Sequence, residues 1–314
     1  MDPIVFTIAG LIIVGMSWCL VGVILGRAPK DGFDTGIVLF TGAIVSVLCS
    51  TVIALCTGVA SNAPLRVTLI TLAVYLVQGV LNFFGMQSMA QGMRRGPNGV
   101  VWGITQSALV FPFTVGIVVF GTEPTFWRLS GIACLLIGLV FYAMTQGGRP
   151  ESAKDLKGSW RFFAFLAFSF IAVQQTLVTT PSYFPEARQV SSILRTLAGG
   201  VGGLVGYSIL FGMRVHREGK AALTAFENYR HPRFWAYIFC LQFFSLLFAY
   251  TLLYPGMDKM AERGAGAVSY PLMVASCIIA FTIYSFTVLK EKPTVKQILA
   301  LVFCLIGLGC MCVQ

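Results

Sequence analysis

Uncharged polar side chains recur inside the long apolar stretches of this 314-residue chain. Gln78 and Asn82 lie four residues apart within one apolar stretch, and Trp102 and Gln106 have the same spacing in the next. Side chains four apart share one face of a helix, so each pair is expected to point in one direction. Amide and indole groups beside aromatic faces suit a neutral solute that is rich in hydroxyl groups or amphipathic.

Four further residues of this kind lie in other apolar stretches: Trp18, Gln175, Gln242 and Tyr270. Polar side chains are costly in lipid and usually face the interior of a helix bundle or a water-filled cavity. A second interpretation stays open, because Gln commonly bonds between helices and Trp and Tyr commonly anchor the ends of spans. The residue types therefore predict a substrate-binding role for the set, with helix packing as the alternative.

Arg195 is the one charged residue well inside an expected span, and it follows Arg188 by seven residues. The spacing places both arginines on one helix face, about two turns apart. One hypothesis is a contact to an anionic or hydroxylated substrate, or a gate in which Arg195 pairs with Glu186, Asp258 or Glu262. The alternative is an arginine that extends its side chain to the membrane interface.

Chemistry that needs reactive side chains is not predicted. No Asp or Glu falls well inside an expected span, so the sequence lacks the embedded carboxylate of a proton-for-cation exchange pump. The nine cysteines have no histidine or carboxylate beside them in the spans and form no metal-ligand spacing. We expect no enzyme, no metal and no cofactor, while a proton or sodium ion remains an open candidate for coupling.

The elements that position these residues are expected to be membrane-spanning helices. Fifty-seven per cent of the residues are apolar and 11% are charged, too few for the exterior of a soluble protein of this size. A span needs about 20 apolar residues, and stretches of that length recur throughout the chain. The expected spans are 4–25, 36–59, 66–91, 98–121, 125–146, 160–181, 189–213, 234–256, 265–289 and 294–313.

Basic residues concentrate in the connections after the odd-numbered spans. The rule that cytoplasmic connections are rich in Lys and Arg places these connections inside and both termini outside, in a bacterial inner membrane. The net charge of +10 then reflects membrane orientation, with the lipid bilayer as a partner and no nucleic acid. Within the basic loop 214–233, residues Ala221 to Tyr229 are expected to form a short interfacial helix.

Two parts of the chain match each other at an offset of 169 residues. Residues 107–125 resemble 276–294, with a shared Pro-Thr pair at 124–125 and 293–294. Each half holds five expected spans, so the second half must enter the membrane from the opposite side, as in many secondary transporters. The expected organisation is a first five-helix repeat at 1–146, a cytoplasmic linker at 147–159 and a second repeat at 160–314.

The ends of the two halves, 120–138 and 289–307, together with the Ser-Tyr-Pro-Leu motif at 269–272, resemble the ten-helix drug/metabolite transporter superfamily. The outside termini and neutral polar spans are most similar to its rhamnose–proton symporter and glucose-uptake branch. The resemblance implies an all-helical membrane protein of two inverted five-helix repeats.

We therefore expect a secondary transporter that moves a small, neutral, sugar-like solute by alternating access. Export of amino acids or amphipathic compounds is the alternative, followed by a passive channel or a structural membrane protein. The glycines at 199–203 are interpreted as a packing surface or as a flexing point for alternating access.

Overall fold

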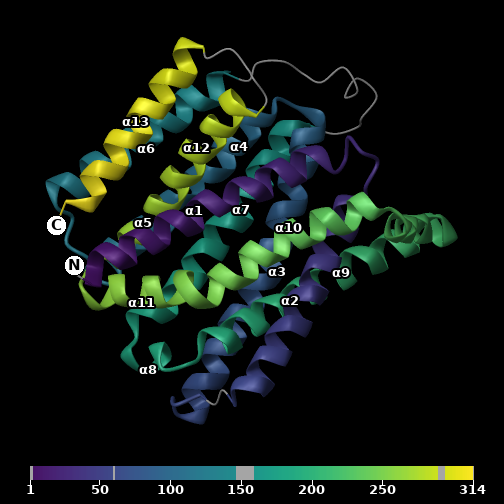
Figure 1. Ribbon diagram of the computed structural model, residues 1–314, viewed down its shortest axis with the longest axis horizontal. Helices are drawn as coiled ribbons and strands as arrows, with labels where there is room; N and C mark the ends of the chain where they lie inside the picture. The colour runs from purple at the N-terminus through teal and green to yellow at the C-terminus, as the bar shows by residue number, and fades with distance from the viewer. Residues whose placement is uncertain (1–2, 59–60, 146–158, 289–293, 314) are drawn as a thin grey trace.

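The computed structural model describes residues 3–58, 61–145, 159–288 and 294–313, and every regular element in these ranges is helical (Figure 1). Ten helical segments among them are long and apolar enough to cross a membrane. The expectation of ten spans is confirmed, and the chain is described below as an integral membrane protein. The expected linker at 147–159 lies outside the described residues except for Ser159.

The first five spans are formed by α1 (Pro3–Arg27), α2 (Thr35–Thr57), α3 (Leu65–Arg95), α4 to α5 and α6 (Phe126–Thr145). The fourth span is not one regular helix, since α4 (Asn98–Gln106) continues through the 3-10 turn η1 (Ser107–Leu109) into α5 (Val110–Val118). The Ser107 hydroxyl donates to the Ile104 carbonyl at 2.7 Å, and Pro112 has no N–H to donate back to the preceding turn. These two residues explain the interruption.

The second five spans begin with α7 (Trp160–Thr179), which ends in the 3-10 turn η3 (Thr180–Tyr183), and the short α8 (Pro185–Arg188) follows. The remaining elements are α9 (Ser192–Glu218), the 3-10 helix η4 (Gly219–Arg230), α10 (Pro232–Phe248), the π turn η5 (Ala249–Leu253), α11 (Tyr254–Glu262), the 3-10 turn η6 (Gly266–Val268), α12 (Ser269–Thr287) and α13 (Val295–Cys312). The short helix expected in the basic loop is thus a 3-10 helix, and the loop itself is shorter because α9 extends to Glu218.

Several expected span boundaries were wrong by about a turn or more, including the end of the third span, which reaches Arg95, and two boundaries near the candidate site. The seventh span begins at Ser192 because the Ser191 hydroxyl accepts a hydrogen bond from the Ile193 N–H and caps the helix. The eighth span continues past Pro255 to Glu262, since the π turn η5 accommodates the proline within the helix. Both changes concern the end of the molecule where the chain termini lie, called the terminal end below (Figure 1).

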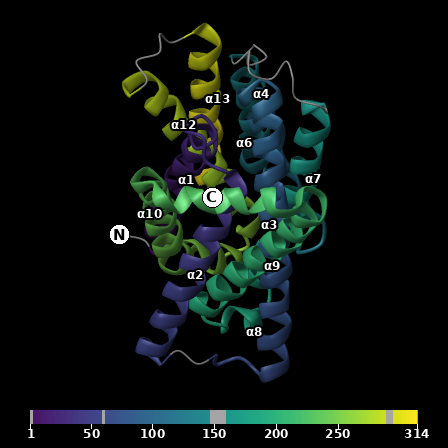
Figure 2. The same cartoon turned by 90° about the vertical axis from the view of Figure 1, so that its right-hand side faces the viewer.

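Five helix pairings define the architecture. α3 packs against both α7 and α9, α2 packs against α9, α1 against α12, and α6 against α13 (Figures 1 and 2). Gly79 faces the Gly199 carbonyl and Gly202 faces the Leu76 carbonyl, so the backbones of α3 and α9 are in direct contact. The glycines at 199–203 therefore act here as a packing surface, as small residues commonly do between spans.

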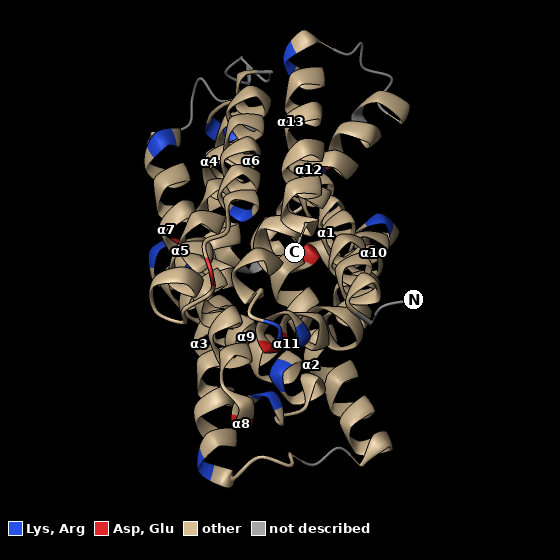
Figure 3. Ribbon diagram, turned by 90° about the vertical axis from the view of Figure 1, so that its left-hand side faces the viewer, with Lys and Arg blue, Asp and Glu red and all other residues tan. Residues whose placement is uncertain are grey.

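The membrane-facing surface is apolar. Leu55, Val118 and Phe126 are each more than 70% exposed, at 77%, 75% and 74%. Most Lys and Arg residues lie near the helix ends, with uncharged ribbon between them (Figure 3). This distribution fits helices whose middles lie in lipid and whose ends reach the aqueous interfaces.

Candidate functional site

A cavity of about 300 Å³ lies among helices from both halves of the chain. Side chains from α1, α2, α3, α4, α7, α9, α10 and α12 line it, together with Leu253 of η5 and Tyr254 of α11. Six of the lining side chains carry amides: Gln78, Asn82, Gln106, Gln174, Gln175 and Gln242. Among the described residues, no charged side chain lines this cavity.

The cavity brings together every residue proposed from the sequence except Arg195. Trp18, Gln78, Asn82, Trp102, Gln106, Gln175, Gln242 and Tyr270 all line it, although they come from six different helices. Their assembly at one place is a geometric finding, and their role in binding remains a prediction.

The close crossing of α3 and α9 positions the amides of α3. Gln78 is 8% exposed, and its Oε1 atom lies over Gly199, where an added methyl group would be 3.3 Å away. Asn82 follows one turn later on the same face and also lines the cavity. Any larger residue at Gly199 would therefore press on the Gln78 amide.

Aromatic rings form a second class of lining group. The Trp18 ring of α1 and the Tyr270 ring of α12 lie 5.6 Å apart between centroids, with an interplanar angle of 43°. The Trp102 ring packs against Gly22 of α1 and lies 6.4 Å from Phe281, nearly parallel to it. Rings held in this way offer rigid flat faces to a ligand.

Gln175 is buried without full hydrogen bonding. Its side chain is 4% exposed, and its Oε1 atom has no hydrogen-bond partner in the described part of the chain. An unpaired buried acceptor costs about 1–3 kcal/mol, so such groups usually meet a water or a ligand. Gln175 is consistent with a site that is completed by another molecule.

Arg195 lies behind the cavity wall rather than on it. Its side chain has no exposed surface, and its Nη1 atom donates to both carboxylate oxygens of Asp258, each at 3.0 Å. The Nη2 atom donates to the Ala187 carbonyl at 2.9 Å. The alternative in which Arg195 extends to the interface is therefore wrong, because its charge is paired inside the protein with Asp258, one of the three partners considered for it.

Two tyrosines pack against this ion pair, and one of them, Tyr254, also lines the cavity. The Tyr75 and Tyr254 rings each lie 5.9 Å from the Arg195 guanidinium carbon and pack edge to face at 5.1 Å. Tyr75 also donates its hydroxyl to the Val178 carbonyl at 3.2 Å. Since Tyr254 lines the cavity, the ion pair lies one helical turn beyond its wall.

A carboxylate inside a span was missed in the sequence. Asp258 was assigned to a connection because the eighth span was expected to end at residue 256, yet it lies in the middle of α11. The spacing held a usable signal: Asp258 and Glu262 are four residues apart on a helix, and each binds one of the two arginines. The second pair joins Arg188 and Glu262 at 2.8 Å.

Several lining residues were not proposed from their spacing, among them Thr105, Thr196, Gln174 and Tyr254. Both threonines also donate to carbonyls one turn back in their own helices, a role that sequence does not separate from site contact. No sequence signal marks them beyond their position in a span.

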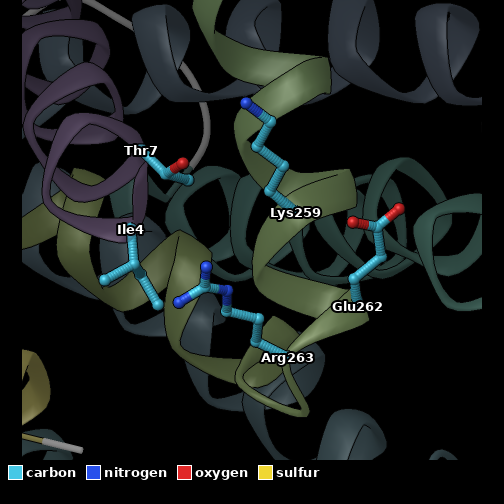
Figure 4. Close-up of a pocket in the computed structure, with 5 residues that line it drawn as sticks. All are labelled: Ile4, Thr7, Lys259, Glu262 and Arg263. Atoms are coloured by element: carbon cyan, nitrogen blue, oxygen red, sulfur yellow. The ribbon is translucent and has the colours of Figure 1, made fainter. Parts of the chain in front are cut away.

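A smaller depression of about 130 Å³ lies at the terminal end, between the start of α1 and the end of α11. Ile4, Thr7, Lys259, Glu262 and Arg263 line it (Figure 4). It holds charges of both signs and none of the proposed site residues. The depression shows that the end of α11 borders the first turns of α1.

Among the described residues, no three His, Cys, Asp or Glu side chains lie close enough together to hold a metal ion. All nine cysteines are free thiols.

Comparison with known proteins identifies a similar fold. No family model matches the sequence, and no curated protein matches it. A protein of known crystal structure is similar, with a TM-score of 0.65 and 12% identity, over 96% of this chain and 98% of the other. At that identity the likeness concerns the fold alone, and the two proteins share it along nearly their whole lengths.

Proposed function

We propose that the protein is a secondary transporter that carries a small, neutral, sugar-like solute across the inner membrane by alternating access. The observation that supports this most directly is the uncharged cavity, lined by amides and aromatic rings, among helices of both halves. Such a cavity offers hydrogen bonds in both directions and flat apolar faces, without a fixed charge. A hydroxylated ring has the complementary chemistry.

The absence of charge on the described cavity wall argues against an ionic solute. An ion that enters loses hydration, and isolated charges are costly to bury unless they are paired. A neutral polyol loses less and regains hydrogen bonds from the amides. The cavity is therefore better suited to neutral solutes than to lipophilic cations.

Helix contacts support two inverted repeats. If the halves are exchanged span by span, the contact of α1 with α12 corresponds to that of α7 with α4, and α4 with α6 corresponds to α12 with α13. The contact of α3 with α7 corresponds to that of α10 with α1, and α6 with α13 corresponds to itself. An arrangement of this kind allows one fold to form two access states.

The packing of α6 on α13 supports the repeat at the level of residues. Gly131 faces the Gly307 carbonyl, and Gly138 faces the Ala300 carbonyl. At the offset of 169 residues, Gly131 corresponds to Ala300 and Gly138 corresponds to Gly307. Exchanging the two halves therefore converts the Gly131–Gly307 contact into the Gly138–Ala300 contact. A pseudo-twofold axis between these helices accounts for the correspondence.

The sequence resemblance places this proposal in the drug/metabolite transporter superfamily, near the rhamnose–proton symporter and glucose-uptake branch. The basic connections favour termini on the outer side of the membrane. The domains proposed are the repeats at 1–146 and 160–314, and a proton or sodium ion is the proposed coupling partner.

A second candidate, export of amino acids or amphipathic metabolites, is favoured by one observation. The Arg195–Asp258 pair lies one turn behind the wall, and a zwitterion that reached it would find both counter-charges. This solute would need Tyr75 and Tyr254 to move aside, because they separate the pair from the cavity. The neutral solute needs no such rearrangement and is preferred.

The test is the thermal stability of the purified protein in detergent against monosaccharides, amino acids, nucleotide sugars and lipophilic cations. A ligand that binds the folded state raises stability by RT ln(1 + [L]/Kd), so above Kd the rise must grow with the logarithm of the ligand concentration. A rise with one class of neutral sugar, lost in Asn82→Ala, supports the proposal. A rise confined to amino acids or cations refutes the neutral-solute assignment.

A further inference from the structure

The eighth span contains a break in its helical bonding, next to the cavity. The π turn η5 (Ala249–Leu253) separates α10 from α11, and Pro255 is the second residue of α11. A proline cannot donate its share of the helical hydrogen bonds, and π turns occur frequently at functional sites. The backbone at 249–255 can therefore bend more easily than a continuous α-helix.

The segment beyond this break, α11, is held to the neighbouring helices by two ion pairs. Asp258 pairs with Arg195 of α9, and Glu262, one turn later, pairs with Arg188 of α8. The inner pair is buried, with side-chain exposures of 0% and 14%, while Glu262 is 54% exposed. The two carboxylates share one face of α11, so both pairs attach the same face.

The position of α11 relates these contacts to access. Tyr254, its first residue, lines the cavity, and its last turn borders the beginning of α1 at the terminal end (Figure 4). Asp258 lies between these two points. α11 therefore extends from the cavity to the terminal end of the molecule.

We propose that α11 is a gate at the terminal end of the cavity, hinged at residues 249–255 and closed by the Arg195–Asp258 pair. Opening swings α11 away from α9, removes Tyr254 from the cavity wall and exposes both charges to water. As a step in transport this rests on the proposed function, but the opening of α11 can be measured without any solute.

An ion pair suits a contact that must form and break. Buried charges left without partners are strongly destabilising, which keeps the closed state in place. In the open state both groups regain hydration, so opening costs less than deleting one partner does. The outer Arg188–Glu262 pair adds less, because exposed pairs contribute little.

Hydrogen–deuterium exchange of the full-length protein in lipid nanodiscs tests the gate. In Asp258→Asn, amides of 249–262 are expected to exchange at least tenfold faster than in the parent, with amides of α13 unchanged. Lys259→Gln is the matched control, since it removes an adjacent exposed charge on the same helix and should leave exchange within twofold. The double variant R195D/D258R should return exchange toward the parent value.

Acceleration spread equally over all helices would indicate general destabilisation and overturn the proposal, as would equal exchange in Asp258→Asn and Lys259→Gln. Arg195→Lys covers the case in which Asp258→Asn does not fold, and it should give a smaller local increase. If α11 opens in this way but no neutral solute binds, the gate stands and the proposed solute fails. If a neutral solute binds and exchange of α11 is insensitive to the pair, the gate fails.

Discussion

The crossing of α3 and α9 predicts opposite effects for one substitution at two positions of the same helix. A methyl group added at Gly202 would overlap the Leu76 carbonyl oxygen and lie 3.0 Å from the Gly79 Cα atom. These are backbone atoms, which cannot rotate away, so α3 and α9 must separate. At Gly212, ten residues further along α9, an added methyl group meets nothing within 4 Å.

The size of the effect follows from packing. Overfilling a well-packed site costs about 1–3 kcal/mol, and contact with backbone atoms of two α3 residues puts Gly202→Ala at the upper part of that range. Gly212→Ala carries no such cost, and replacing a helical glycine by alanine gains at most about 1 kcal/mol. Since Gly79 and Gly199 border the cavity, Gly202→Ala should also displace the Gln78 amide and weaken ligand binding.

The measurement is the free energy of unfolding, obtained by titration with SDS in mixed micelles and followed by tryptophan fluorescence. The expected result is a loss of about 2–3 kcal/mol for Gly202→Ala and no loss for Gly212→Ala, on the same packing argument. A free energy of unfolding for Gly202→Ala equal to that of the parent protein would refute the direct backbone contact. A loss for Gly212→Ala of similar size would show instead that α9 tolerates no side chain at its glycines.

Two other substitutions test separate parts of the structure. Trp102→Ala should weaken binding of the cavity ligand, measured by calorimetry, by about tenfold, since an aromatic contact contributes about 0.5–1.5 kcal/mol beyond its buried area. The control is Trp235→Ala, whose residue is 48% exposed and lies outside the cavity, and its Kd should be unchanged. Gly138→Ala and Gly307→Ala should lower the free energy of unfolding by similar amounts, because the repeat makes their contacts across the α6–α13 interface equivalent. Gly309→Ala, with open space at its Cβ position, should not change it, and unequal losses at the first two positions would argue against the pseudo-twofold axis.

The spans could be predicted from the sequence because hydrophobic length is a local property. A run of about 20 apolar residues can satisfy its backbone in lipid only as a helix, so composition alone determines the element. The bounds of α1 and α2 accordingly fall within two residues of the expected ones, whereas α3 extends four residues further than expected, to Arg95. Residues Pro29 to Gly32 and the Pro-Thr pair at 124–125 lie in the connections between these helices, where the apolar runs end.

The irregular segments could not be predicted, because tertiary contacts decide them. Pro255 is normally a sign that a helix has ended, yet here the π turn before it lets the helix continue to Glu262. Because the eighth span was expected to end at residue 256, Asp258 was not recognised as a residue inside a span. Helix α8 was missed because Pro185 to Arg188 is a short polar segment between two expected spans, and the cap at Ser191 was missed because the seventh span was expected to begin at residue 189.

The candidate site was predictable where helical spacing carries the information. Gln78 with Asn82 and Trp102 with Gln106 were identified as pairs on shared faces, and both pairs line the cavity. The contacts between faces of different helices are long-range, and a single sequence does not reveal them. The ambiguity of Arg195 has the same origin, because its partner lies 63 residues away on another helix.

The separation of charge from the cavity by a single helical turn connects the two proposals. If Arg195 and Asp258 lined the cavity, their field would select ionic solutes, and each bound solute would compete with the pair that closes α11. Because Tyr254 lies between the cavity and the ion pair, with Tyr75 packed beside it, the cavity stays neutral while the charges remain available to hold the terminal end shut. A neutral solute can then bind without breaking the pair, so binding and opening can be separate events. Coupling between them must act through Tyr254, which touches the cavity on one side and the ion pair on the other.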